Sequence, residues 1–200
     1  MPEMYYTDIK IDREVEGDGL DIVTLIAQAV HSNNSHTLHK IAIDFPEMAR
    51  FESSNPFGYH VRLFSLDWRT LEDFRSVRVV KALSDACSIT LSSTATPPET
   101  DNFRVIRRIR NDAKTEAGVS QRIKRDIARG YTDVARRRKP ENAGNLPYLK
   151  IRSSTTGQAF SIFIGVENMT GSLSSGDIAN INSYGLSPER TSHFFAIPAF

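Results

Sequence analysis

The chain has 200 residues, 40% of them hydrophobic, and a formal net charge of +1, which fits one large domain or two small ones with a real core. It contains no run of 18 apolar residues, so we expect no transmembrane helix, and the acidic start MPEMYYTDIKIDRE lacks the apolar region of a signal peptide. The single cysteine, Cys87, excludes an intramolecular disulfide and fits a reducing compartment. We therefore expect a soluble cytoplasmic protein in which Cys87 is a buried structural thiol.

The first half of the chain alternates between strand and helix patterns. Five segments have the alternation or the β-branched content of strands: 5–11, 39–46, 59–65, 77–82 and 88–93. Two segments repeat apolar residues at helical spacing: 17–34, and 68–77 with Asp67 as its N-cap. The order is roughly strand, helix, strand, strand, helix, strand, with 77–82 and 88–93 as short strands at its end, and this order is the ferredoxin-like (RRM-like) pattern. We therefore predict an α+β protein whose residues 1–98 form a ferredoxin-like domain, a fold that hosts many functions and fixes none.

The second half begins after a polar, linker-like stretch that ends near residue 102. Residues 103–111 (FRVIRRIRN) read as a strand with basic side chains next to apolar ones, and a helix follows at about 115–129. Three later segments read as strands of a second sheet: 146–154, 159–165 and 193–200. The polar residues 165–182 between them are predicted to form a long loop. Residues 99–200 are thus expected to form an α+β C-terminal domain with an arginine-rich helix.

Positive charge is concentrated in residues 104–139, which carry a net charge of +9 while the rest of the chain carries −8. On a helical wheel Arg122, Arg125 and Arg129 share one face, and Ile123 and Ile127 lie on the opposite one. A solvated helix would normally compensate its own charge with acids four residues away, and this one has few. The pattern favours a nucleic-acid site over an acidic protein partner, a membrane surface or a solvated helix face.

Metal chemistry finds little support in the sequence. His31, His36 and His39 have a spacing that invites a zinc site, but their segment contains no cysteine or carboxylate, and polar loop residues are the better interpretation. No acidic cluster suggests two-metal phosphodiester chemistry, and no glycine-rich phosphate loop is present. We therefore expect no metal and no cofactor. Acid–base chemistry remains, with His31 and the polar segments 152–160 and 182–187 as candidates.

These segments carry a family resemblance. KIRSSTTGQAFSIFI (150–164), followed by NSYGLS (182–187) and an aromatic C-terminal segment, resembles the CRISPR repeat-processing endoribonuclease of the type I-F system, which joins an R-S-x-S-T-G-Q-x-F motif to a YGLS box. YTDIKI, the helix that ends near a histidine and IAIDFP resemble the first strand, helix and second strand of that family. The resemblance covers most of the chain and is weakest at about 46–100. Thr155 stands where the family motif has serine, which keeps a hydroxyl.

The resemblance implies a reaction and the residues that perform it. It implies a single metal-independent cut at the 3′ base of a repeat hairpin, in which the ribose 2′-hydroxyl attacks the adjacent phosphate. His31 would be the base, Ser153 would hold the attacking ribose and Tyr184 would orient His31. The residues implied to bind RNA are Arg108, Arg110, Arg122, Lys124, Arg125, Arg129, Arg152, Thr155 and Phe160.

The resemblance also implies partners. The protein would stay on the crRNA stem-loop as a subunit of the type I-F effector complex, beside its backbone subunits, in antiviral defence or in a transposon-associated complex with a transposition adaptor. Two alternatives remain open at this point. One is a non-catalytic subunit that binds and caps the crRNA hairpin, and the other is a DNA-binding accessory protein.

Overall fold

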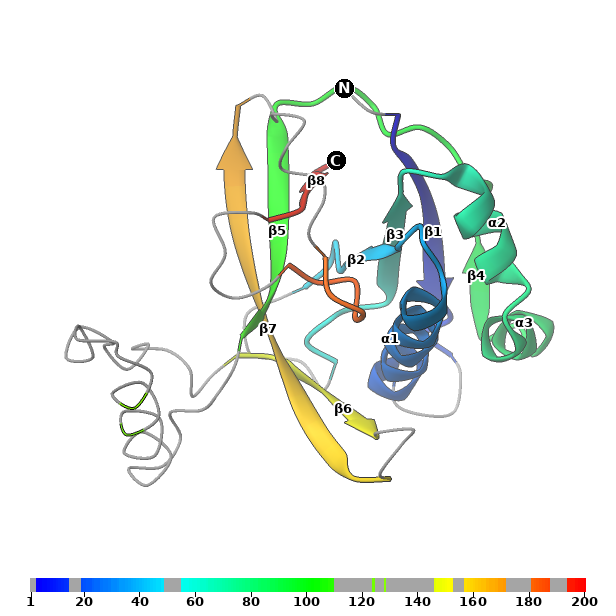
Figure 1. The fold of residues 1–200 in the computed structure, drawn as a ribbon. Coiled ribbons are helices and arrows are strands. Elements are labelled where there is room, and N and C mark those ends of the chain that lie inside the picture. The colour runs from blue at the N-terminus through cyan, green and yellow to red at the C-terminus, as the bar shows by residue number, and fades with distance from the viewer. Residues whose placement is uncertain are drawn as a thin grey trace.

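The computed structural model describes residues 3–14, 19–48, 55–109, 124, 128, 146–152, 157–171, 181–187 and 194–200. Within these residues the chain forms the helices α1 to α3, two further helical residues at 124 and 128, and strands that make two four-stranded antiparallel sheets (Figure 1). The predicted α+β class is confirmed. No helix in the described part of the chain is long and apolar enough to span a membrane.

The first sheet has the predicted ferredoxin-like arrangement. Its strands are β1 (Tyr5–Ile11), β2 (Ala42–Asp44), β3 (His60–Ser65) and β4 (Ile89–Leu91), in the order β2-β3-β1-β4. Helix α1 (Gly19–His36) joins β1 to β2, and α2 (Trp68–Arg75) and α3 (Arg78–Asp85) join β3 to β4. The predicted N-cap of α2 is present, because the Arg69 N–H donates to the Asp67 side chain at 3.2 Å.

Two predictions about this half are wrong. Residues 78–82 lie in helix α3 rather than in a strand, because Val77, Val80 and Leu83 are three residues apart. Val80 is buried in the core, and Val77 and Leu83 pack against that core. The β-branched pair at 79–80 had favoured a strand, and the helical spacing decides the outcome. Cys87 is exposed rather than buried, and it has a positive φ of 57° two residues after the end of α3.

Strand β2 is shorter than predicted, with three residues in place of the expected 39–46. All three of its residues are buried, so the alternation of a half-exposed strand is absent. Ile43 belongs to the same buried cluster as Val30 of α1 and Ile106 of β5, and Asp44 forms an ion pair with Arg104 of β5. Figure 1 shows β2 at the edge of the first sheet that lies toward β5.

The second sheet uses the strands expected from the C-terminal half. They are β5 (Asn102–Ile109), β6 (Tyr148–Arg152), β7 (Ala159–Thr170) and β8 (Ala196–Pro198), in the order β6-β7-β5-β8. Residues 165–170, predicted as loop because they are polar, belong to β7 and pair with β5 from Gly165 to Thr170. Backbone pairing along a long partner strand has outweighed side-chain polarity there. The rest of the predicted loop and most of the predicted helix at 115–129 lie outside the described residues. Lys124 and Ala128 of that helix are helical and exposed.

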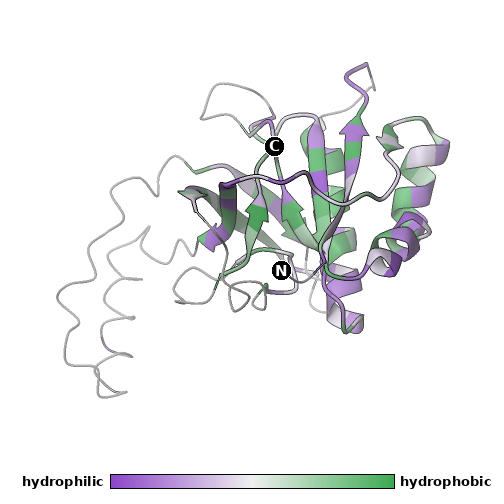
Figure 2. Ribbon diagram, turned by 90° about the horizontal axis from the view of Figure 1, so that it is seen from above, coloured by the Kyte–Doolittle hydropathy of each residue, from purple (hydrophilic) through white to green (hydrophobic). Residues whose placement is uncertain are grey.

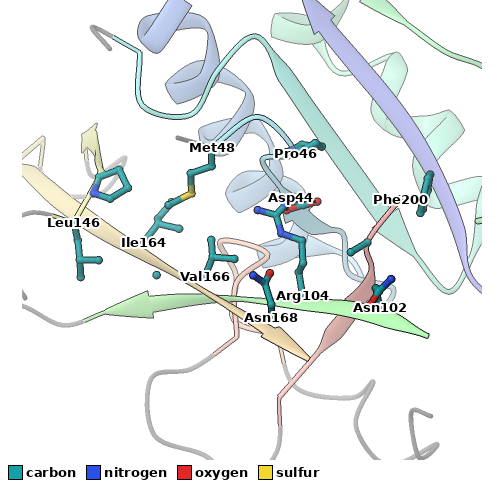
Figure 3. Close-up of a pocket in the computed structure, with 13 residues that line it drawn as sticks. Asp44, Pro46, Met48, Asn102, Arg104, Leu146, Ile164, Val166, Asn168 and Phe200 are labelled. Carbon is teal, nitrogen blue, oxygen red and sulfur yellow. Dashed lines mark hydrogen bonds and ion pairs between the residues drawn. The ribbon is translucent and has the colours of Figure 1, made fainter. Parts of the chain in front are cut away.

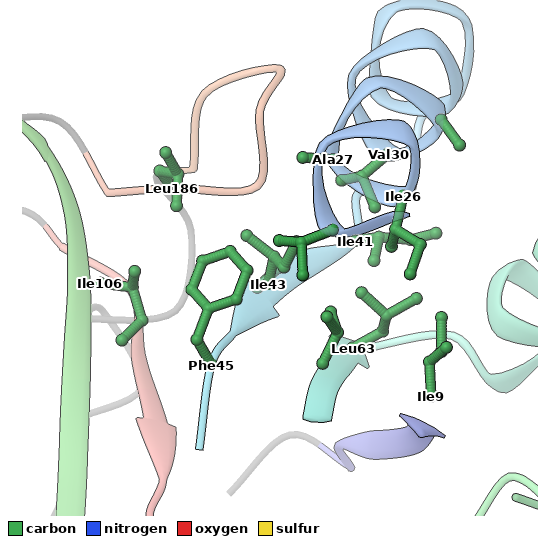
Figure 4. Packing of buried hydrophobic residues seen from close by; sticks show 14 of the residues in the cluster. Ile9, Ile26, Ala27, Val30, Ile41, Ile43, Phe45, Leu63, Ile106 and Leu186 are labelled. Carbon is green, nitrogen blue, oxygen red and sulfur yellow. The ribbon is translucent and has the colours of Figure 1, made fainter. Parts of the chain in front are cut away.

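One hydrophobic cluster spans both sheets. Ile43 and Phe45, in and next to β2, belong to the same cluster as Ile106 of β5 and Leu186 of the 181–187 segment (Figure 4). Hydrophobic residues gather on the central strands, and the outer helix surfaces are more hydrophilic (Figure 2). Along the sequence, the last strand of the first sheet ends at residue 91 and the first strand of the second sheet begins at residue 102, on either side of the predicted boundary at 98. The division into two domains stays a prediction.

A polar contact also joins the two sheets. The Arg62 guanidinium of β3 donates to the Phe200 carbonyl at 2.8 Å, and its central carbon lies 3.9 Å from the centre of the Phe200 ring. The same guanidinium donates to both carboxylate oxygens of Asp8 on β1. Burial raises the pKa of Asp8, but hydrogen bonds from His60 and Arg62 outweigh it and lower that pKa to about 2. The segment after β8 is thus anchored on the first sheet.

Candidate active site

His31 lies near the end of α1, where a neighbouring asparagine fixes the helix to the sheet. Asn34, one turn further on, donates from its side-chain amide to the Ile41 carbonyl and accepts from the Ile41 N–H, both at 2.8 Å. Asn34 is buried, so these bonds satisfy backbone groups that would otherwise be unpaired away from water. The end of α1 is therefore held directly against the start of β2, and His31 with it.

Residues 181–187 form a tight turn organised by Asn182. Its side-chain oxygen accepts from the Tyr184 N–H at 2.8 Å, and its carbonyl accepts from the Gly185 N–H at 3.0 Å. Gly185 has a φ of +73°, a conformation that glycine adopts at little cost. These contacts explain why asparagine and glycine flank the tyrosine in NSYGLS.

The turn is docked on the first sheet. The Ile43 N–H of β2 donates to the Gly185 carbonyl at 3.0 Å, and a β-carbon on Gly185 would lie 2.6 Å from the Ile41 carbonyl oxygen. The ammonium group of Lys40 donates to the Ile181 carbonyl at 3.0 Å. Glycine is therefore required at 185 both for its backbone conformation and for the close approach to β2.

The same turn is also bound to the second sheet. The Ser187 N–H donates to the Ile106 carbonyl at 2.8 Å, and the Arg108 N–H donates to the Ser187 carbonyl at 3.0 Å. The segment thus lies between β2 and β5. Tyr184 is held where α1, β5 and β7 meet.

Three of the predicted site residues gather around the ring of a fourth, Tyr184. The His31 ring stacks on it with the ring centres 4.1 Å apart and an angle of 10° between the planes. The Phe160 ring of β7 meets it edge-on, with the centres 6.3 Å apart. The guanidinium carbon of Arg108 lies over the ring, 5.4 Å from its centre. The structure thus brings together residues that are far apart in the sequence.

The surroundings of His31 favour its neutral form. Burial lowers the pKa of His31 from its ordinary value of 6.5, the charge of Arg108 lowers it further, and the Ser183 backbone opposes both. Nδ1 of His31 is shielded from solvent and has no hydrogen-bond partner, so an imidazolium would leave a buried N–H unpaired. Burial also raises the pKa of Tyr184, which keeps the phenol protonated. The stacked pair is neutral near about pH 7.

The other predicted site residues are placed less completely. Arg152 is exposed at the end of β6 and pairs with Ala159, the residue before Phe160. Lys124 is helical and exposed. The remaining ones lie outside the described residues: Arg110, Arg122, Arg125, Arg129, Ser153 and Thr155.

Sequence reasoning missed the residues that hold the site in place. Asn182 and Gly185 had a signal, because asparagine and glycine on either side of a dipeptide are typical of a turn. Asn34 and Lys40 had none. Their partners, Ile41 and Ile181, accept or donate with backbone groups, which no side-chain pattern reveals.

A separate cavity of about 680 Å³ lies between β2 and the second sheet (Figure 3). Arg104 and Asp44 point toward each other in it, with Nη1 3.2 Å from Oδ1. Burial raises the pKa of Asp44, and Arg104 opposes this. His31, Arg108, Phe160 and Tyr184 do not line the cavity. The cluster around Tyr184 is therefore a distinct site.

Comparison with known proteins identifies the family. A solved structure described as "Structure A of CRISPR endoribonuclease Cse3 bound to 19 nt RNA" aligns with 98% of this chain and 100% of its own, at 11% identity and a TM-score of 0.38, a likeness too weak to bear on function. The sequence profile of the CRISPR-associated protein (Cas_Csy4) family matches residues 6–200. Because this match covers nearly the whole chain, the protein belongs to the Cas_Csy4 family of type I-F CRISPR-associated endoribonucleases.

Proposed function

We propose that this protein cleaves CRISPR repeat RNA once, at the 3′ base of its hairpin, without a metal ion. The observation that carries the proposal is the neutral His31 imidazole stacked on Tyr184, held between α1 and the second sheet. A neutral imidazole is the form that accepts a proton in general base catalysis. Membership of an endoribonuclease family supports RNA as the substrate.

The proposed reaction is an internal transfer at one phosphate. His31 accepts the proton of the ribose 2′-hydroxyl, and the 2′-oxygen attacks the adjacent phosphorus. The bond from phosphorus to the 5′-oxygen breaks, and that oxygen takes up a proton. The products are a 2′,3′-cyclic phosphate and a 5′-hydroxyl.

The other residues of the cluster position the reactants. Tyr184 holds the imidazole plane by stacking, which fixes the direction of its lone pair. Phe160 stacks on a base at the foot of the stem, where such contacts are worth about 1–3 kcal/mol. Ser153 holds the attacking ribose, as the sequence motif predicts. The remaining residues predicted from the sequence bind the RNA backbone and base edges, namely Arg108, Arg110, Arg122, Lys124, Arg125, Arg129, Arg152 and Thr155.

We propose further that the protein stays on the crRNA stem-loop in the cytoplasm as a subunit of the type I-F effector complex. The high positive charge of residues 104–139 supports a tight hold on RNA phosphates. A subunit that only caps the hairpin would bind in the same way without cutting. A transposon-associated complex with a transposition adaptor would use the same hairpin contact.

The role of His31 is tested with the protein's own repeat hairpin, under single-turnover conditions. His31→Ala should cleave about 100-fold or more slowly, since a general base contributes about 10²–10⁴-fold, while its affinity for RNA changes little. His36→Ala is the matched control, because His36 is an exposed histidine in the last turn of the same helix. A His31→Ala variant that cuts at the wild-type rate would disprove the base assignment. Binding without cutting by the wild type would make the protein a capping subunit.

A further inference from the structure

Substrate binding creates a problem for the proposed base. A phosphate next to His31 stabilises the imidazolium, so the bound RNA raises the pKa of the group that must stay neutral. Cleavage near neutral pH therefore benefits from a positive charge close to His31. That charge must be fixed in position when RNA binds, because a mobile side chain would turn toward the phosphate.

Arg108 meets both conditions. Its guanidinium lies over the Tyr184 ring on which His31 stacks, so it lies within about 10 Å of the imidazole, close enough for charges to interact in a partly buried site. Its backbone N–H is bonded to Ser187, the last described residue of the turn that carries Tyr184. The backbone of Arg108 and the Tyr184 ring are thus anchored to the same segment, and the guanidinium lies over that ring.

Among the described residues, Arg108 is the only charged side chain that acts on the pKa of His31. On α1, the residues three and four positions from His31 are Ala27, Gln28, Asn34 and Ser35, all uncharged. The 181–187 turn presents Tyr184 and the Ser183 backbone, and β7 presents Phe160. Strand β6, which also packs against α1, turns Leu149 and Ile151 inward and leaves its charged residues exposed. Lys40 is exposed and bonded to the Ile181 carbonyl.

We propose that Arg108 is a positioning residue that keeps His31 in its neutral, base-competent form when the scissile phosphate is bound. The cation acts across the Tyr184 ring on the protonation of His31, in addition to any contact with RNA. This proposal rests on the proposed function, because neutrality of His31 matters only if His31 is the base. The effect of the Arg108 charge on the protonation of His31 can nevertheless be tested separately, since it exists whether or not the protein cuts RNA.

The direct test is the titration of His31 by NMR, in protein labelled at histidine, with the signal assigned by its loss in His31→Ala. The titration is run without RNA and with the repeat hairpin carrying a 2′-deoxy ribose at the cleavage site. Arg108→Gln should raise the midpoint by roughly 0.3–1 unit, the effect of one charge at this distance. Arg108→Lys, which keeps the charge, should stay near the wild type. Arg107→Gln is the matched control, because Arg107 is the adjacent cation and pairs with Glu167 instead.

Single-turnover cleavage at saturating RNA gives the second readout. Arg108→Gln should reach its half-maximal rate at a pH higher than the wild type by the same shift, whereas a purely structural defect would lower the rate equally at every pH. An unchanged His31 midpoint in Arg108→Gln, or an equal shift in Arg108→Lys, overturns the proposal. If the wild type cuts no RNA while the midpoint still moves, the proposed function fails and the influence of Arg108 on His31 stands.

Discussion

His31, the proposed base, depends on its surroundings for its neutral form. Its burial, its unpartnered Nδ1 and the Arg108 charge all favour the neutral ring, and the stacked Tyr184 fixes its orientation. A solvent-exposed histidine would lose both advantages, because it would be partly charged near its ordinary pKa and free to rotate. The neighbours of His31 therefore set both the protonation state and the orientation of its ring.

The lowered pKa of His31 predicts the pH dependence of the free enzyme. The neutral fraction rises as pH increases through the pKa, so kcat/KM should rise with pH and reach half its plateau below 6.5. Tyr184 adds no fall on the basic side until well above about pH 9, because its pKa is raised. The measurement is kcat/KM on the repeat hairpin from about pH 5 to about pH 8. A half-plateau above 6.5 would show that the base is not in the environment described.

At the scale of an element, the 181–187 turn is the piece that assembles the site. Replacing Gly185 by alanine forces a side chain into a positive φ and toward the Ile41 carbonyl. The expected cost is about 2–4 kcal/mol of folding free energy, or displacement of the turn from β2. Because the turn carries Tyr184, cleavage should slow even in molecules that remain folded.

Gly171→Ala is the matched control for this variant. Gly171 also has a positive φ, of +124°, but a β-carbon there meets nothing within 4 Å. It should lose stability through backbone strain alone and keep its cleavage rate. The free energy of unfolding, measured by chemical denaturation, and the single-turnover cleavage rate are compared between the two variants. The comparison separates the effect of backbone strain from the effect of losing the contact between the turn and β2. Equal effects in the two variants would show that the contact with β2 is unimportant.

Elements with a regular pattern were predictable from the sequence, and elements shaped by tertiary contacts were not. Strand β1, helix α1 and the Asp67 cap follow from local periodicity and capping chemistry. Helix α3 was missed because adjacent valines imitate a strand, and the end of β7 was missed because its pairing with β5 is a long-range interaction. The family motifs pointed to His31 and Tyr184. The stacking of their rings, the position of Arg108 over Tyr184 and the hydrogen bond from Asn34 to Ile41 could be seen only in the folded structure.

At the scale of the whole molecule, the two sheets share one core. Ile106 of β5 is 3% exposed and belongs to the same cluster as Ile43 and Phe45 of the first half. Arg62 adds a polar link by binding the Phe200 carbonyl. The site lies where the halves meet, so its geometry depends on their staying together. A chain of two independent domains at 1–98 and 99–200 would make that geometry variable.

The shared core predicts a single unfolding transition. Ile106→Ala should destabilise the protein by about 2–4 kcal/mol, the usual cost of a large-to-small change in a core. Trp68, the single tryptophan, lies on α2 in the first half and reports on that half by fluorescence. Its transition in denaturant should move together with the transition seen by far-UV circular dichroism. If Ile106→Ala left the midpoint of the Trp68 transition unchanged, the two halves would instead be independent domains.

The central claim, metal-independent cleavage by 2′-hydroxyl attack, is tested most directly by incubating the protein with its own repeat hairpin in EDTA and identifying the fragment ends. We predict one cut at the 3′ base of the stem, a 2′,3′-cyclic phosphate on the upstream fragment, and no cut when the scissile ribose is 2′-deoxy. Cleavage that is lost in EDTA and restored by a divalent cation, or that leaves a 3′-hydroxyl, would contradict the account.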